Sequence, residues 1–85
     1  MISAFEVSGH SMEPSLSEGD RILVWKTRKL RQNDIAVFHA ADRLLVKRVQ
    51  KGVQAGFRVT GGNEAHSDSR FVPSGEVIGK VIFRY

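Results

Sequence analysis

The 85-residue sequence contains no cysteine, and this absence excludes a disulfide framework, a thiolate metal site and a cysteine nucleophile. Long apolar runs are also absent. The longest, 22–25 and 35–38, fall far short of the roughly 20 residues that a membrane-spanning helix needs. The first residues lack the basic start and apolar stretch of a secretory signal. We therefore expect a cytoplasmic protein, with membrane association only if a longer native chain supplies an anchor.

Length and charge limit further which classes of protein and of partner the sequence allows. A chain of this size suits one small domain over residues 1–85 with one modest core. The formal charge is +4, and a basic excess can favour nucleic acid or an anionic membrane surface. The basic residues are scattered except in the stretch 26–31, so the pattern favours a solvated surface. We expect no nucleic-acid partner, no metal and no other cofactor.

Short apolar runs separated by turn residues are typical of strands. The candidate strands are 4–7, 21–26, 34–39, 44–50, 56–60 and 77–84. Turn residues at 41–42 and 51–52 predict hairpin connections, and Pro14 favours one short helical turn after Ser11. Few strands with little helix must roll up to bury a core, so we expect an all-β fold with a bent, partly closed sheet.

Ser11 is the first candidate for a catalytic role. Gly9 before it permits a positive φ, and Pro14 after it favours a tight turn or a helix start. A serine at a strand-to-helix junction has free backbone N–H groups nearby, which can form an oxyanion hole. The simpler interpretation is that Ser11 caps a helix, because capping serines are far commoner than nucleophiles. Taken alone, the segment favours the cap.

Lys47 is the candidate base. In an alternating strand it shares one face with Leu45 and Val49, on the apolar side. A lysine held in apolar surroundings loses its proton more readily and can then act as a general base near neutral pH. In the alternative, Lys47 extends to the sheet edge, or the strand faces the other way and Arg48 is buried instead.

The stretch 61–70 is rich in glycine and polar residues and predicts a loop. A catalytic lysine needs a partner that orients its amine, and a hydroxyl such as that of Ser67 can do this. Asp68 and Arg70 can lock the loop as a charge pair. The alternative is an ordinary polar surface loop.

Taken in order, these segments resemble the type I signal peptidases and their soluble relatives. The matching motifs are Ser-Met-x-Pro at 11–14, Gly-Asp at 19–20, Val-Lys-Arg-Val at 46–49, Gly-x-Asn at 61–63, Ser-Asp-Ser-Arg at 67–70 and Gly-Lys at 79–80. The compact form is most similar to the small soluble proteases proposed to mature nickel-type superoxide dismutase. It is similar, more distantly, to the peptidase half of self-cleaving repressors of the LexA type.

The resemblance implies a serine endopeptidase that removes an N-terminal leader or signal peptide from a protein substrate. It assigns Ser11 as nucleophile and oxyanion-hole donor beside Gly9, and Lys47 as base. We expect the substrate to lie extended beside residues 3–7, pairing main chain to main chain. The side chains expected to contact it are Phe5, Val7 and Met12.

The sequence departs from the family pattern in the loop. Gly62 stands where the family usually has aspartate, and the loop is one residue short. Anchoring the alignment on the first half makes Ser67 the lysine-orienting residue, whereas anchoring it on 68–70 puts His66 there. Some relatives use a histidine base, but His10, His39 and His66 do not lie in a matching segment.

Two other functions compete with the peptidase. The first is a peptidase-like domain that has lost activity, which Gly62 keeps open. The second is a small basic β-barrel that binds nucleic acid, with Trp25, Phe38 or Phe57 stacking on bases. In each case exposed edge strands would favour self-association.

Overall fold

The computed structural model describes residues 1–9, 12, 15–40, 43–61 and 69–85. The strands are β1 (Ile2–Glu6), β2 (Arg21–Trp25), β3 (Ile35–Ala40), β4 (Arg43–Val53), β5 (Gly56–Thr60), β6 (Arg70–Pro73) and β7 (Val77–Arg84). A 3-10 turn, η2 (Ser74–Glu76), precedes β7. The expected all-β class is confirmed, and no helix in the described part of the chain is long and apolar enough to cross a membrane.

Two local predictions were wrong. The hairpin expected at Lys51–Gly52 lies further on, because β4 continues to Val53 and the turn is made by residues 54–55, with Ala55 at a φ of 66°. Alternation fails here because Gln50 is an extra residue, a β-bulge, between the pairs formed by Val49 and Lys51. The second error concerns β6. The polar residues before it predict a loop over 61–70, and no strand was predicted after that loop until residue 77.

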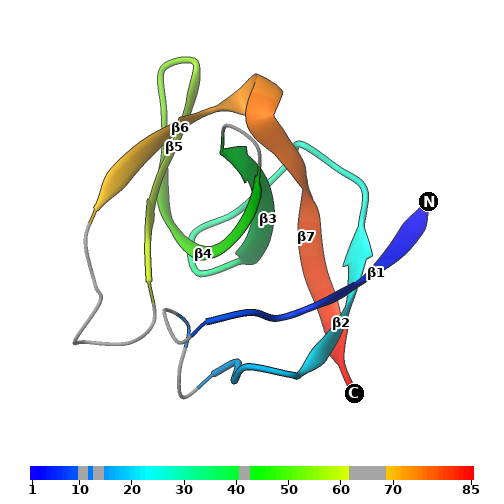
Figure 1. Cartoon of the computed structure of the whole chain (residues 1–85). Helices are drawn as coiled ribbons and strands as arrows, with labels where there is room; N and C mark the ends of the chain where they lie inside the picture. Colours follow the sequence, from blue (N-terminus) through cyan, green and yellow to red (C-terminus); the bar gives the residue numbers. More distant parts are fainter. Residues whose placement is uncertain (10–11, 13–14, 41–42, 62–68) are drawn as a thin grey trace.

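The seven strands form one sheet in the order β1-β2-β7-β3-β4-β5-β6, so β1 and β6 are its edges (Figure 1). Every pairing is antiparallel. The strand β7 joins the two halves, because it pairs with β2 on one side and with β3 on the other. Two register shifts in β7, at Ile78 and Ile82, accompany its bend.

The sheet curls so strongly that each of its faces is buried in one half of the molecule. One buried cluster lies under β1 and β2 and comprises Val7, Met12, Leu16, Ile22, Val24 and Val37. The other is enclosed by β3 to β6 and comprises Ala36, Phe38, Val49, Val59, Val72 and Val77. Consecutive residues of β3 therefore belong to different clusters, which explains its unbroken apolar run.

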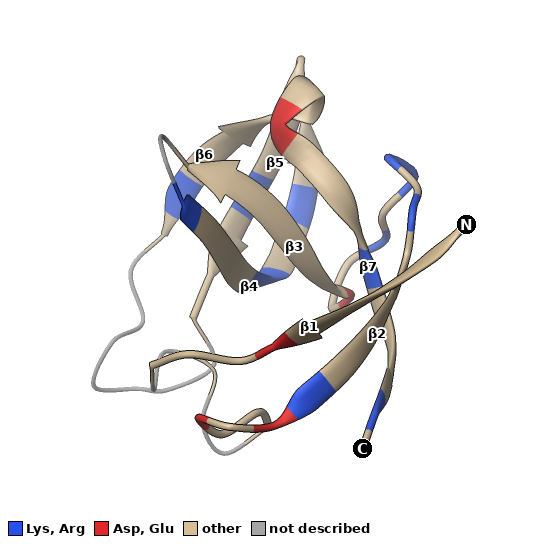
Figure 2. Ribbon diagram, turned by 45° about the vertical axis from the view of Figure 1, so that its right-hand side comes forward, with Lys and Arg blue, Asp and Glu red and all other residues tan. Residues whose placement is uncertain are grey.

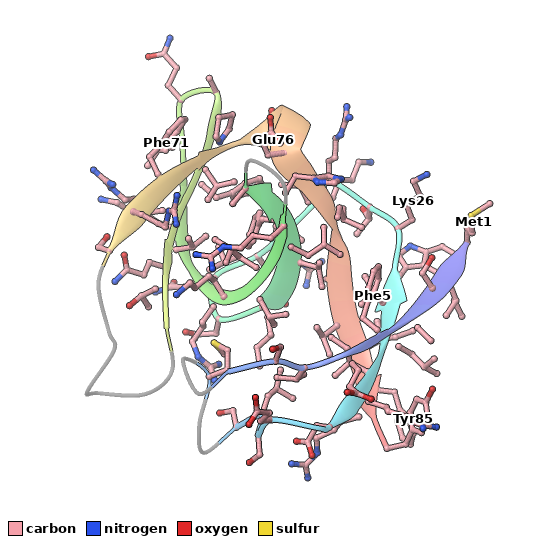
Figure 3. The ribbon with its side chains drawn as sticks, in the orientation of Figure 1. Met1, Phe5, Lys26, Phe71, Glu76 and Tyr85 are labelled. Atoms are coloured by element: carbon pink, nitrogen blue, oxygen red, sulfur yellow. The ribbon has the colours of Figure 1, made fainter. Side chains whose placement is uncertain are left out.

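Both halves of the molecule expose basic and aromatic residues. Figure 2 shows Lys and Arg positions along the ribbon of both halves, in agreement with their scattered positions in the sequence. Two exposed aromatic residues, Phe71 and Tyr85, lie at opposite ends of the molecule (Figure 3). This separation allows each exposed surface to be tested by substitution without disturbing the other.

Candidate active site

The predicted nucleophile Ser11, together with His10, lies outside the described residues, but the chain on both sides of it is described. Before it, Val7 donates its N–H to the carbonyl oxygen of Asp20 at 2.8 Å and accepts from the N–H of Gly19 at 2.9 Å. Gly9 then adopts a φ of 87°, a left-handed conformation that glycine adopts readily. The expected positive φ at this position is therefore present.

After Ser11 the chain is anchored in the first cluster. Met12 is 2% exposed and Leu16 is 3% exposed. The Leu16 N–H donates to the Met12 carbonyl oxygen at 2.9 Å, which is one helical turn, although the described residues here form no regular helix. The described residues on both sides of the predicted nucleophile are therefore held in place, by the turn at Gly9 before it and by the buried side chains of Met12 and Leu16 after it.

Lys47 lies in the middle of β4, half-buried, and pairs with Ala36 of β3. Since Ala36 and Val49 both belong to the second cluster, Lys47 projects from the same face as Val49, as the alternation predicts. Arg48 projects from the opposite face. The idea that the strand faces the other way and buries Arg48 in place of Lys47 does not hold, because both side chains are half-buried.

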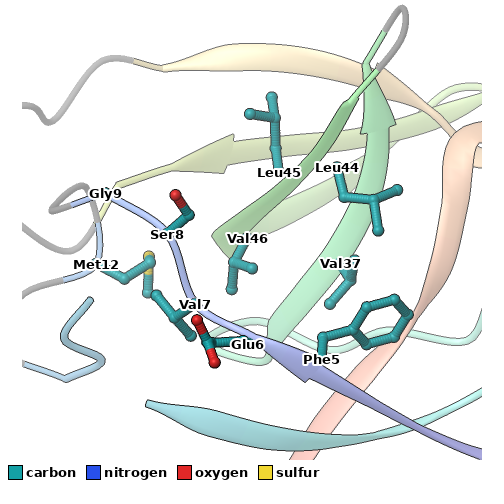
Figure 4. A pocket seen from close by; sticks show the side chains of 10 residues that line it. All are labelled: Phe5, Glu6, Val7, Ser8, Gly9, Met12, Val37, Leu44, Leu45 and Val46. Carbon is teal, nitrogen blue, oxygen red and sulfur yellow. The ribbon is translucent and has the colours of Figure 1, made fainter. Parts of the chain in front are cut away.

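An apolar groove joins the two segments that flank the predicted catalytic residues. It has a volume of about 110 Å³, and Figure 4 shows the chain around Ser8 and Gly9 on one side and β4 on the other. Its lining residues are Phe5, Glu6, Val7, Ser8, Gly9, Met12, Val37, Leu44, Leu45 and Val46. The three side chains expected to contact substrate, Phe5, Val7 and Met12, therefore line one groove.

Sequence reasoning missed the β4 side of this groove. Leu44, Leu45 and Val46 directly precede the predicted base, and Leu44 is 41% exposed despite its apolar side chain. The apolar run that leads from the predicted hairpin to the predicted base was the sequence signal that could have identified this wall of the groove. Val37 also lines the groove. Its place there follows from the pairing of β3 with β4, which no pattern in the sequence around Val37 indicates.

Two arginines hold the segment that follows Ser11. Arg48 donates from Nη2 to Ser15 Oγ at 3.0 Å and from Nη1 to the Asn33 carbonyl oxygen at 3.3 Å. From β7, Arg84 donates from Nη1 to the Ser15 carbonyl oxygen at 3.4 Å and lies 3.6 Å from Asp20 Oδ2. The neighbour of Lys47 on β4 therefore ties the predicted base's strand to the predicted nucleophile's segment, which the sequence did not indicate.

The predicted lysine-orienting loop is described only at its end. Gly62, His66, Ser67 and Asp68 lie outside the described residues. Arg70 begins β6 and pairs with Val59, which pairs in turn with Val49, so its side chain belongs to the same sheet face as Lys47. Ser69 Oγ donates to Gln50 Oε1 at 2.8 Å and fastens the loop's end to β4.

The residues invoked for other functions lie apart. Phe38 is fully buried and is not available to stack on bases, Phe57 is half-buried, and Trp25 is 44% exposed on the other half of the molecule. His39 is exposed on β3. Within the described ranges, no group of three or more His, Asp or Glu residues could hold a metal ion.

A comparison with protein families gives one result. The family model described as Peptidase S24-like matches residues 2–82, nearly the whole chain. No curated protein matches it. The matched span includes both edge strands, the groove and both predicted catalytic positions.

Proposed function

This chain belongs to the Peptidase S24-like family, and from that premise we propose that it is a serine endopeptidase that uses Ser11 and Lys47 as a catalytic dyad. The family match supports a serine-peptidase function in general. The observation that carries the finer assignment is the apolar groove, because its two walls are the chain segments next to Ser11 and next to Lys47. A peptide seated in it would place a scissile bond between them.

In the proposed reaction, Ser11 Oγ attacks the scissile carbonyl carbon while the uncharged Lys47 amine accepts the hydroxyl proton. The oxyanion of the tetrahedral intermediate accepts a hydrogen bond from the Ser11 backbone N–H. Lys47 then gives the proton to the leaving amine, and the C–N bond breaks to leave an acyl-enzyme ester. A water that loses its proton to Lys47 hydrolyses this ester and regenerates Ser11.

The substrate's main chain is proposed to pair with β1. Among the described strands it is an edge of the sheet, and one row of its backbone groups faces no other described strand. Phe5 and Val7 face the groove side, so alternate substrate side chains would enter the apolar recess. The small volume of the recess favours a compact apolar substrate side chain near the cut.

We propose leader removal as the biological reaction and the cytoplasm as its place, with which a chain without cysteine is compatible. The first substrate to test is the leader-bearing precursor of a nickel-type superoxide dismutase, the substrate class suggested by the sequence resemblance. Residues 1–85 would then act as one catalytic domain.

The test compares wild type, Ser11→Ala and Lys47→Met in the cleavage of leader peptides, followed by mass spectrometry. Loss of the nucleophile or the base is expected to lower kcat by about 10²–10⁴-fold or more. Lys51→Met is the matched control, because Lys51 is an exposed lysine on the same strand beyond the bulge. Equal cleavage by all four proteins would refute the dyad, and binding of peptides by wild type without cleavage would identify an inactive peptidase-like domain.

A further inference from the structure

The outer surface of β4, β5 and β6 carries a row of two cations and one aromatic ring. In antiparallel sheets, directly paired residues project from the same face. Lys51 pairs with Arg58, and Arg58 pairs with Phe71, so their side chains form one row across the three strands, which we call the outer row. Val59, the neighbour of Arg58, belongs to the buried second cluster, so the row lies on the opposite, solvent-facing side. All three residues are exposed.

The Phe71 ring is held in place by Gly56. A Cβ atom at Gly56 would lie 2.7 Å from Phe71 Cε1 and 2.8 Å from Phe71 Cζ, closer than real Cβ atoms approach. The ring therefore occupies the space that any other side chain at position 56 would need, which is a known way of covering a glycine in a strand. This contact supports the ring from one side, while 42% of the residue remains exposed. Phe71 thus presents a fixed aromatic surface to solvent.

The charge of these three strands has one sign. The described segments 43–61 and 69–73 contain neither aspartate nor glutamate (Figure 2). Their basic residues are Arg43, Lys47, Arg48, Lys51, Arg58 and Arg70. Lys51 and Arg58 face each other directly, and like charges in such a pair destabilise a sheet. Neither of them forms an ion pair with another described residue. An anionic ligand bound between the two cations would relieve their repulsion.

The aromatic ring beside the cations decides which anionic partner fits. A single-stranded nucleic acid offers phosphates to Lys51 and Arg58 and unpaired bases that stack on Phe71. An acidic peptide would match the cations, but the face of an aromatic ring carries negative potential and repels a carboxylate. An anionic membrane favours apolar side chains that extend into the lipid, whereas the Phe71 ring packs back against Gly56. The combination therefore favours single-stranded nucleic acid.

We propose that the outer row binds single-stranded nucleic acid, with one base stacked on Phe71 and adjacent phosphates bound by Arg58 and Lys51. Three neighbouring strands span about 10 Å, which corresponds to about three nucleotides of a stacked strand. So few phosphate contacts give weak, salt-dependent binding, with a Kd of about 10⁻⁴ M at physiological salt. The three residues lie far apart in the chain, so the sequence alone predicts no nucleic-acid partner. The proposal is independent of the catalytic assignment, because no residue of β5 or β6 lines the groove.

The experiment titrates fluorescent oligo-thymidine of about ten nucleotides with the whole chain and follows anisotropy at several salt concentrations. For wild type, the logarithm of the association constant should fall with the logarithm of the salt concentration with a slope of about −1.4, as two phosphate contacts predict. Arg58→Gln and Lys51→Gln should each reduce this slope by about 0.7. Phe71→Leu should weaken binding about five-fold or more with an unchanged slope, because it removes stacking and keeps an apolar side chain over Gly56.

Lys26→Gln and Tyr85→Leu are the matched controls. They change an exposed lysine and an exposed aromatic residue on the other side of the molecule from Phe71 (Figure 3). Both should bind the oligonucleotide as wild type does. If Lys26→Gln weakened binding as much as Arg58→Gln, net charge alone would explain the attraction and the proposal would be overturned. Circular dichroism checks that each variant is folded, and Phe71→Leu should cleave leader peptides at the wild-type rate.

Three other results would also overturn the proposal. The first is an absence of binding at the lowest salt concentration. The second is equal or tighter binding of a duplex of the same length, because paired bases cannot stack on Phe71. The third is competition by oligo-glutamate or by vesicles of anionic phospholipid as effective as that by unlabelled oligo-thymidine, which would assign the outer row to an acidic protein segment or to a membrane instead.

Discussion

Two glycines with the same backbone conformation allow the active-site assignment to be separated from stability. Gly9 has a φ of 87° and Gly19 a φ of 89°, and a Cβ built at either position meets no atom within 4 Å. An alanine at either site therefore introduces backbone strain without a steric clash. Only Gly9 lies two residues from the predicted nucleophile.

The cost of each substitution follows from the conformation. A left-handed residue other than glycine costs about 1–2 kcal/mol. The smaller conformational freedom of alanine in the unfolded chain returns about 0.4–1 kcal/mol. The free energy of unfolding should thus fall by about 1 kcal/mol in Gly9→Ala and equally in Gly19→Ala. With a urea slope of about 1 kcal/mol/M for a chain of this size, each midpoint should fall by about 1 M.

Cleavage should distinguish the two variants. A relaxation of the strained turn at position 9 would move the nucleophile, and a displacement of about 1 Å can cost about 10²-fold in rate. We expect Gly9→Ala to lower kcat for a leader peptide by 10-fold or more, whereas Gly19→Ala retains wild-type kcat. Equal kcat values in the two variants would refute the idea that Gly9 sets the position of the catalytic serine. Midpoints that differ by more than about 1 M would refute the estimate of strain.

Three further predictions concern the core, the groove and the arginine tether. Phe38→Ala should lower the free energy of unfolding by about 3–5 kcal/mol in urea titration, because the side chain is fully buried in the second cluster. Leu44→Ala should raise KM for leader peptides about five-fold with little change in stability, since removing a half-exposed groove side chain loses about 1 kcal/mol of apolar contact. Arg48→Met should lower kcat more than KM rises in steady-state cleavage, because the hydrogen bond from Arg48 to Ser15 connects the strand of Lys47 to the segment that follows Ser11; an unchanged kcat would contradict this role.

The sequence predicted those features that depend on local pattern. Alternation located four of the seven strands to within one residue, β1 to within two and β4 to within three, and it placed Lys47 on the face of Val49. It failed where the backbone departs from regular pairing, as at Gln50, where an extra residue moves Lys51 to the other face. It also missed β6, in which only Phe71 and Val72 are apolar. Short runs of this kind become strands through the neighbour that pairs with them, here β5.

The candidate site likewise has some features that the local sequence pattern predicts and others that it does not. The motifs indicated Gly9, which has the expected positive φ, and Met12, which was expected to contact substrate and lines the groove. The opposite wall of the groove and the contact of Arg48 with Ser15 arise between residues far apart in the chain. Such contacts depend on how the sheet curls, and no spacing along the sequence encodes them.

The position of β7 has a consequence for how the protein is made. This strand follows the other six in chain order, yet it lies between β2 and β3 in the sheet. Until β7 leaves the ribosome, β2 and β3 each present an unpaired edge, and the nascent chain consists of two hairpin assemblies without a common sheet. The groove needs both assemblies, because β1 supplies one wall and β4 the other. A nascent chain would therefore be unable to cut its neighbours on the same polysome before its own synthesis had passed β7.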